Sequence, residues 1–210
     1  MNIIKSFLAA SAALLLVSCN GGMSLTGVQM DTEEGVQKVV DVISQNIDAS
    51  QWKLVELSWM DMDLSNDLTV ISTRIVDKDG HDYVQSFAGS DFQPSAPSES
   101  YNIFGRISSK EAPAIDMKKL DAKRIMKHVE TAKKMIPAEY EFKSLGRYEL
   151  SSNSTDENRA EHFTINVTEK GKEYVRSAGK ESLVYYQLEF YVAPDGNIVS
   201  STLEKMNKED

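Results

Sequence analysis

The sequence has little of what covalent and catalytic chemistry requires. Of its 210 residues only Cys19 is a cysteine, so no disulfide can form within the chain. The three histidines, His81, His128 and His162, lack the spacing of metal ligands. Nucleophile-elbow, phosphate-loop and zinc-protease motifs are also missing. These absences predict a protein that is not an enzyme and that holds neither a metal ion nor a cofactor.

Basic residues are scarce relative to acidic ones. The chain has 23 Lys+Arg against 32 Asp+Glu, which gives a formal net charge of −9. Binding to nucleic acid needs basic patches, so this balance argues against nucleic acid as a partner. Hydrophobic residues make up 41% and charged residues 26%, as is typical of a folded domain.

Long hydrophobic runs are absent as well. A membrane-spanning helix needs roughly 18 or more apolar residues, and no segment has them. The most apolar segment, residues 7–17, follows Lys5 and has the length and charge pattern of a signal peptide. It ends in Leu16, Val17, Ser18 and Cys19. These four residues resemble the lipobox of bacterial lipoproteins.

The resemblance implies cleavage before Cys19 and attachment of lipid to its sulfur. Residues 1–18 are then a signal peptide, and residues 19–30 are a lipidated tether. An ordinary signal peptide with a chance cysteine is the alternative. A lipid anchor would hold the protein on a bacterial membrane in the cell envelope. Surface-displayed lipoproteins of some bacteria carry acids directly after the cysteine, and residues 20–23 have none. The expected location is therefore the periplasm-facing outer membrane.

Two amphipathic helices are predicted, one in each half of the chain. The first covers residues 32–47, with Asp31 as its expected N-cap. Pro113 and Asp116 lead into the second, which has Asp121 near its start and is stopped by Pro137. Their apolar stripes are offset by 89 residues and consist of Val36, Val40, Ile43 and Ile47 in the first and Ile125, Val129, Ala132 and Ile136 in the second.

Alternating and β-branched residues predict strands after each helix. The expected strands are residues 52–62, 68–76, 81–87, 101–107, 140–150, 163–167 and 184–192. The octets 79–86 and 170–177 share four identical residues at an offset of 91. The sequence therefore predicts an α+β fold built as a tandem repeat, residues 31–109 and 110–210. Each repeat has one helix followed by a three- to four-stranded antiparallel sheet. A single α+β domain with coincidental spacing is the alternative.

Residues 186–199 form an alternating strand, an Asp195-Gly196 turn and a short return strand. This segment resembles the final hairpin of PepSY-like domains. Tandem helix-plus-sheet repeats also resemble the fold of the β-lactamase inhibitor protein. These resemblances imply a periplasmic inhibitor or binding module without catalysis.

The second helix offers one candidate binding surface. Lys123, Lys127 and Lys134 lie opposite its apolar stripe and form a basic ridge. This ridge either faces solvent or meets an acidic partner or lipid headgroups.

The last long strand offers the other candidate surface. Its apolar residues alternate with Tyr185, Gln187, Glu189 and Tyr191, which must share the opposite face. Because a helix covers only one face of a sheet, this mixed face meets either the other repeat or solvent. We predict that it is partly open and binds the partner.

The sequence thus predicts a non-catalytic, lipid-anchored envelope protein that acts as a protein-binding or inhibitor module. It would contact the membrane through its N-terminal lipid and a protein partner in the envelope. The alternative is a carrier of a small apolar ligand in a pocket between the repeats. A filled core with an exposed patch would favour the first function, and a sizeable apolar pocket the second.

Overall fold

The computed structural model describes residues 26–100, 109–152, 160–177 and 180–206. The predicted signal peptide, Cys19 and the first part of the tether lie outside these residues. So does the expected strand over residues 101–107.

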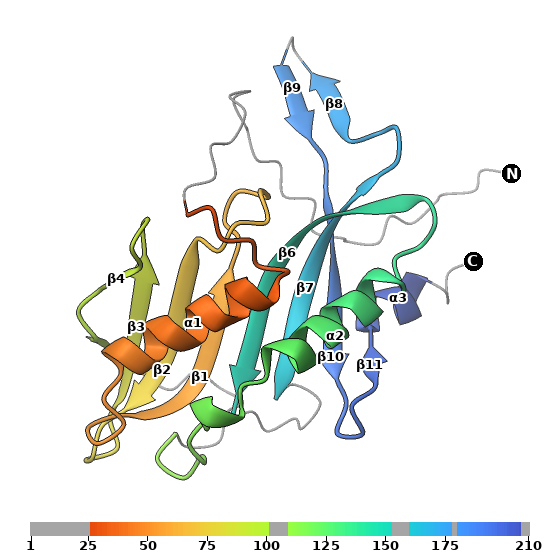
Figure 1. Ribbon diagram of the computed structural model, residues 1–210. Coiled ribbons are helices and arrows are strands. Elements are labelled where there is room, and N and C mark those ends of the chain that lie inside the picture. Colours follow the sequence, from red (N-terminus) through yellow and green to blue (C-terminus); the bar gives the residue numbers. More distant parts are fainter. Residues whose placement is uncertain (1–25, 101–108, 153–159, 178–179, 207–210) are drawn as a thin grey trace, which may run out of the picture.

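Most strands belong to one antiparallel sheet (Figure 1). These are β1 (Lys53–Met60), β2 (Val70–Val76), β3 (Asp82–Ala88), β4 (Gln93–Pro94), β5 (Ser98–Glu99), β6 (Tyr140–Ser151), β7 (Glu161–Glu169), β10 (Tyr186–Val192) and β11 (Ile198–Val199). Their order is β11-β10-β7-β6-β1-β2-β3-β4, and β5 also pairs with β3. With the helices described next, the chain is an α+β protein.

The two long helices are α1 (Glu33–Asn46) and α2 (Ala122–Lys133). A 3-10 turn, η1 (Met117–Lys119), precedes α2, and a short helix, α3 (Ser201–Met206), ends the described chain. Asp121 caps α2 by accepting hydrogen bonds from the backbone N–H groups of Lys123 and Arg124. Periodicity predicted both long helices because each one buries a single face.

The predicted N-cap of α1 is wrong by one residue. Thr32, not Asp31, caps the helix, since its hydroxyl accepts a hydrogen bond from Gly35 N at 3.0 Å. The carboxylate of Asp31 instead accepts hydrogen bonds from Lys133 Nζ and Asn66 Nδ2. Gly35 is required by close packing, because a Cβ there would lie 2.2 Å from Gln29 O.

A row of stacked aromatic rings crosses the middle of the sheet beneath the helices. Trp59 on β1 stacks on Tyr148 on β6, with ring centroids 4.8 Å apart. Tyr148 stacks on Phe163 of β7 at 5.1 Å, and Phe163 stacks on Phe190 of β10 at 5.5 Å. All four rings are almost fully buried. The row therefore joins strands from both halves of the chain in one core.

The two halves meet edge to edge through their first strands. β1 pairs with β6 from Glu56↔Ser151 to Met60↔Arg147. Asn66, in the β1–β2 loop, strengthens this junction because its side-chain oxygen accepts a hydrogen bond from Leu145 N on β6 at 2.9 Å. The two groups of strands therefore share one sheet and do not pack face to face.

The sheet does not follow the expected repeat strand by strand. The octet match aligns β3 with β8 (Tyr174–Ser177), but β8 pairs with β9 (Lys180–Leu183) in a separate two-stranded sheet. This β8–β9 hairpin projects beyond the main sheet (Figure 1). β10, which follows it, lies beside β7 in the main sheet.

Candidate functional site

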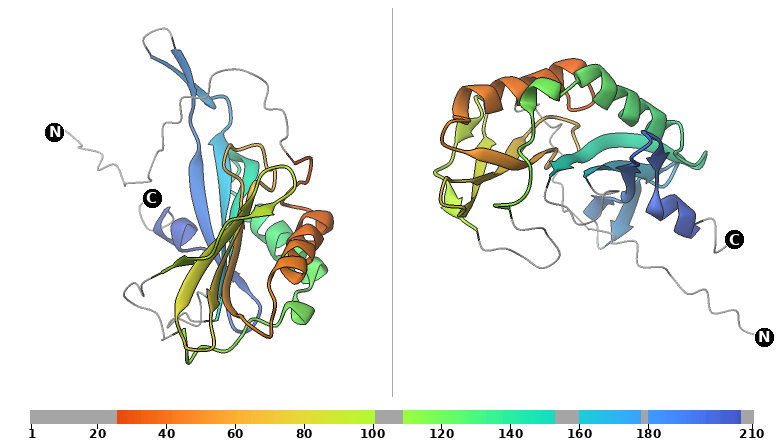
Figure 2. Two further views of the ribbon diagram at one scale, coloured as in Figure 1. Left: turned by 90° about the vertical axis from the view of Figure 1, so that its left-hand side faces the viewer. Right: turned by 90° about the horizontal axis from the view of Figure 1, so that it is seen from below.

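The two long helices cover one face of the sheet. α1 and α2 lie along the same face, as the view from below shows most clearly (Figure 2). In the described part of the chain no long helix covers the opposite face, which we call the helix-free face. Side chains alternate along a strand, so residues next to the buried aromatic row point toward the helix-free face.

Three of the four predicted partner-binding residues on the last strand lie on the helix-free face. Gln187 and Glu189 are exposed and Tyr191 is half-buried, while the alternating Leu188 and Phe190 are in the core. Tyr185 precedes the first residue of β10 and is only 8% exposed, so it offers little surface to a partner.

Charged and aromatic groups of neighbouring strands surround these residues. The ring of His162 on β7 lies 6.2 Å from the ring of Tyr191. The Tyr191 hydroxyl donates to Glu189 Oε2 at 3.2 Å. His162 Nε2 is 3.9 Å from a carboxylate oxygen of Glu149 on β6, and Arg147 forms an ion pair with the same carboxylate. Local sequence patterns did not predict this cluster, because its members are brought together by strand pairing.

A polar floor continues the helix-free face along the strands. Gln187 Nε2 donates to Asn166 Oδ1 at 3.1 Å, and Asn166 Nδ2 donates to Ser144 Oγ at 2.9 Å. Asn166 is 2% exposed and Ser144 is fully buried. Buried polar groups of this kind are stable only when paired. The floor is therefore held in one arrangement beneath the exposed side chains.

The predicted lysine ridge lies on the other side of the molecule. Lys123 and Lys127 are exposed on α2, and Lys134 is exposed at its C-cap. Because α2 covers the opposite face of the sheet, the ridge cannot share one compact site with Gln187 and Glu189.

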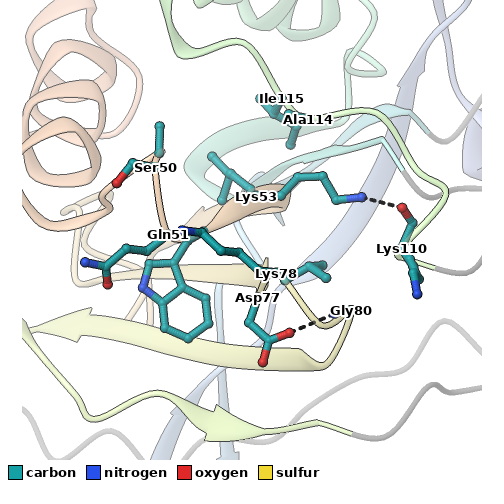
Figure 3. Close-up of a pocket in the computed structure, with 13 residues that line it drawn as sticks. Ser50, Gln51, Lys53, Asp77, Lys78, Gly80, Lys110, Ala114 and Ile115 are labelled. Atoms are coloured by element: carbon teal, nitrogen blue, oxygen red, sulfur yellow. Dashed lines mark hydrogen bonds between the residues drawn. The ribbon is translucent and has the colours of Figure 1, made fainter.

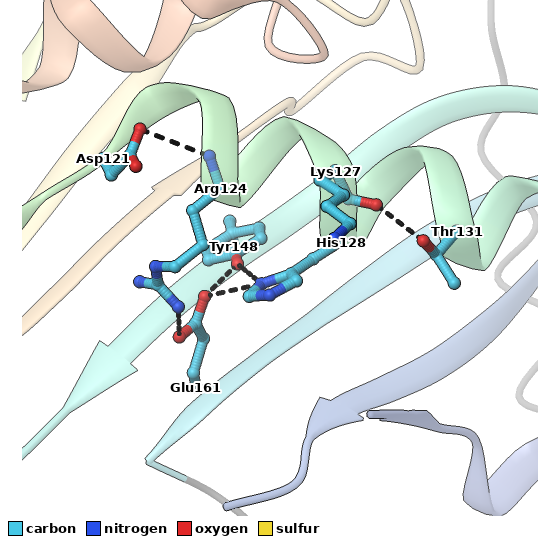
Figure 4. A network of polar contacts seen from close by, with 7 residues as sticks. All are labelled: Asp121, Arg124, Lys127, His128, Thr131, Tyr148 and Glu161. Carbon is cyan, nitrogen blue, oxygen red and sulfur yellow. Dashed lines mark hydrogen bonds and ion pairs between the residues drawn. The ribbon is translucent and has the colours of Figure 1, made fainter. Parts of the chain in front are cut away.

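A buried polar network ties α2 to the sheet (Figure 4). Arg124 Nη1 donates to Glu161 Oε2 at 2.7 Å, and His128 Nδ1 lies 3.1 Å from Glu161 Oε1. The hydroxyl of Tyr148 donates to the same carboxylate. Desolvation by burial raises the pKa of Tyr148 well above its usual value, and the charge of Glu161 acts in the same direction. The Tyr148 hydroxyl therefore stays protonated. Arg124, His128 and Tyr148 all pair with Glu161, which indicates a structural role for the network.

One group of side chains in the described residues has the spacing for a metal ion. Ligand atoms of Asp77, Asp79 and His81 lie within 4.8 Å of one another in the β2–β3 turn. Asp77 is already engaged: Oδ1 accepts from the backbone N–H groups of Asp79, Gly80 and His81. Oδ2 faces the His81 ring and the Tyr83 hydroxyl. The contacts of Asp77 close the β2–β3 turn and account for the proximity of the three side chains.

A concave cleft of about 520 Å³ lies at the end of β1 and β2 (Figure 3). Its lining comes from the α1–β1 connection, the β2–β3 turn and the segment around Lys110 and Ile115. The cleft thus brings together residues of the two predicted repeats.

Comparisons with known proteins do not classify the chain. No family model, curated protein or solved structure matches it. Within the described residues, no helix has the length and apolar character needed to cross a membrane.

Proposed function

We propose that the chain is a non-catalytic, lipid-anchored protein of the bacterial cell envelope that binds another protein through the helix-free face. The observation that carries the proposal is the pair Gln187 and Glu189. Both are exposed beside Tyr191 and His162 on a face that no long helix of the described chain covers.

The chemistry of this face suits protein recognition. Tyr and Arg are enriched at protein interfaces, and Tyr191 and Arg147 lie here among polar neighbours. Contacts within the face, from Tyr191 to Glu189 and from Gln187 to Asn166, restrict the side chains before a partner arrives. Such preorganisation lowers the entropic cost of binding.

Binding on the face is favoured over addition of a strand at an edge. Next to β10, the Thr202 hydroxyl accepts a hydrogen bond from Glu189 N at 3.1 Å, so α3 occupies part of that edge. At the other edge, β4 and β5 pair with β3. Occupied edges leave few free backbone groups for a further strand.

The proposal includes an origin of the fold by tandem duplication of one helix-plus-sheet unit. The first half has the order α1, β1, β2, β3, and the second has α2, β6, β7, β10 with the β8–β9 hairpin as an insertion. In the sheet, β1-β2-β3 runs outward from the junction on one side and β6-β7-β10 on the other. This order supports a duplication, and with it the resemblance to PepSY-like and β-lactamase-inhibitor-like modules.

A carrier of a small ligand is the second candidate function. The cleft of about 520 Å³ supports it, because it is lined from both predicted repeats and has a size typical of small-molecule sites.

Charge reversal separates the two candidate protein-binding surfaces. In the double variant Gln187→Arg, Glu189→Arg, recovery of the partner after crosslinking in intact cells should fall at least about tenfold. The reason is that two cations replace an amide and an acid at the proposed contact. Both side chains are exposed, so the melting temperature should change little.

The matched control is Lys123→Glu, Lys127→Glu, which reverses two exposed charges on α2. Quantitative mass spectrometry of the crosslinked fraction should give wild-type recovery for this control. Loss of the partner with the control, and its retention with the first pair, would assign binding to the ridge.

A further inference from the structure

Apolar residues line part of the cleft at the end of β1 and β2. Among them, Leu54 and Val76 are almost fully buried, and Trp52 and Ile115 are half-buried. The segment that carries Ile115 is fastened to the sheet, since Ile115 N donates to Leu54 O at 2.8 Å. The walls are therefore built from ordered backbone.

Three lysines, Lys53, Lys78 and Lys110, line the same cleft (Figure 3). Lys53 Nζ donates to the carbonyl oxygens of Lys110 at 2.7 Å and of Ala112 at 2.9 Å. An ammonium group has three donors, so one remains for a ligand. Among the described residues, none of the three lysines has a carboxylate within ion-pair distance.

One carboxylate lines the cleft, and its charge is already compensated. Asp77 accepts hydrogen bonds from three backbone N–H groups of the β2–β3 turn. The hydrogen bond from His81 N is the largest of the effects that lower the pKa of Asp77. Asp48 does not line the cleft. Its pKa is lowered mainly by the hydrogen bond that Oδ1 accepts from Ser50 N at 2.8 Å, and the charge of Lys78 contributes less. The cleft is thus a cationic site in an acidic protein.

The position of Lys110 is set by close packing. A Cβ at Gly80 would lie 2.8 Å from Lys110 Cδ, and the φ of Gly80 is +93°. The aliphatic part of Lys110 therefore rests on a turn that has no side chain at this point. This contact keeps the third lysine beside the cleft.

We propose that the cleft binds a small organic anion, a carboxylate carried on a flat apolar body. The apolar body would lie against Trp52, Leu54 and Val76, and the carboxylate would meet Lys78, Lys110 and the free donor of Lys53. The cleft shares no residue with the group around Gln187, Glu189 and Tyr191, so its ligand can be tested separately from the proposed protein partner.

Nuclear magnetic resonance of the two tryptophan indole N–H groups tests the site. Trp52 lines the cleft, whereas Trp59 is fully buried in the core and serves as an internal reference. Naphthalene-2-carboxylate should shift the Trp52 signal with a Kd of about 1 mM or below, and it should leave Trp59 in place. Naphthalene-2-carboxamide, which keeps the shape without the charge, should bind at least about tenfold more weakly. Inorganic phosphate, which has charge without the apolar body, should not displace the carboxylate at equal concentration.

Matched variants assign the charge requirement to the cleft. Lys78→Glu, Lys110→Glu should weaken naphthalene-2-carboxylate at least about tenfold, whereas Lys123→Glu, Lys127→Glu, with the same change in net charge, should not. Both lysines of the first pair are exposed, so thermal unfolding should stay close to wild type. Equal binding of the carboxylate and the carboxamide, unchanged binding in the cleft variant, or no shift of Trp52 would each overturn the proposal.

Discussion

Replacing Trp59 with alanine should lower the free energy of unfolding by about 3–5 kcal/mol. Trp59 is fully buried on β1, beside the junction with β6, and its ring stacks on Tyr148 with an interplanar angle of 14°. The substitution leaves a cavity at one end of the aromatic row. Because the row crosses from one half of the chain to the other, both halves should lose stability together.

Urea denaturation provides the measurement for this prediction. Circular dichroism and hydrogen exchange of β2 and β10 amides should follow one transition in wild type, shifted to lower urea in the variant. Tyr174→Ala is the control, because Tyr174 is 58% exposed and its loss should change the free energy by about 0.5 kcal/mol or less. Two separate transitions, with β10 unaffected by Trp59→Ala, would contradict a shared core.

Cys19→Ser should release the protein from the membrane. The lipobox resemblance makes the Cys19 sulfur the point of lipid attachment, and serine has no thiol to accept it. Each buried CH₂ of a lipid chain contributes about 0.8 kcal/mol, and stable anchoring takes more than one chain or signal. Removing the lipid therefore removes the main attachment that we propose.

Fractionation of cells measures this release. Wild-type protein should sediment with membranes and Cys19→Ser should be recovered in the released fraction. Ser18→Ala, which keeps a small residue before the cysteine, should behave as wild type. Mass spectrometry of the wild-type N-terminus should find a lipid-modified Cys19, and an unmodified Cys19 would remove the anchor from the account.

A lipid on Cys19 would keep the folded part near the membrane. The described chain begins at Thr26, seven residues after Cys19. The Thr26 hydroxyl donates a hydrogen bond to Leu68 O at 2.9 Å. Seven residues span at most about 25 Å when fully extended. The sheet would therefore work close to the bilayer surface.

Local patterns were sufficient to predict the helices and most strands. Val36 and Ile43 on α1, and Ile125 and Val129 on α2, are buried as their periodicity indicates. The N-cap was missed because Asp31 and Thr32 are both good caps, and the choice depends on a distant residue. Lys133 and Asn66 draw the carboxylate of Asp31 away from the helix end.

Pairing between distant segments could not be predicted in the same way. The β1–β6 junction and the bond from Leu145 to Asn66 depend on register across the two halves, which no local periodicity encodes. The octet match was misleading about the sheet, because similar local sequence produced β8 in a separate hairpin.

The candidate site could be predicted only in part, because alternation within one strand is a local pattern and pairing between strands is not. Alternation correctly grouped Gln187, Glu189 and Tyr191 on one face of β10. Tyr185 lies before the strand begins and is only 8% exposed, and alternation alone did not predict its burial. Arg147 and His162 were not predicted to join them, because β6, β7 and β10 are neighbours only in the folded sheet.

Site-specific photo-crosslinking in intact cells tests the central claim most directly. A photoreactive amino acid at Gln187 lies on the exposed part of the helix-free face, and the same amino acid at Lys127 lies on the outer side of α2. We predict a discrete protein adduct from position 187 that disappears when Glu189→Arg is added, and no such adduct from position 127. An adduct from position 127 alone, or none from either position, would contradict binding through the helix-free face.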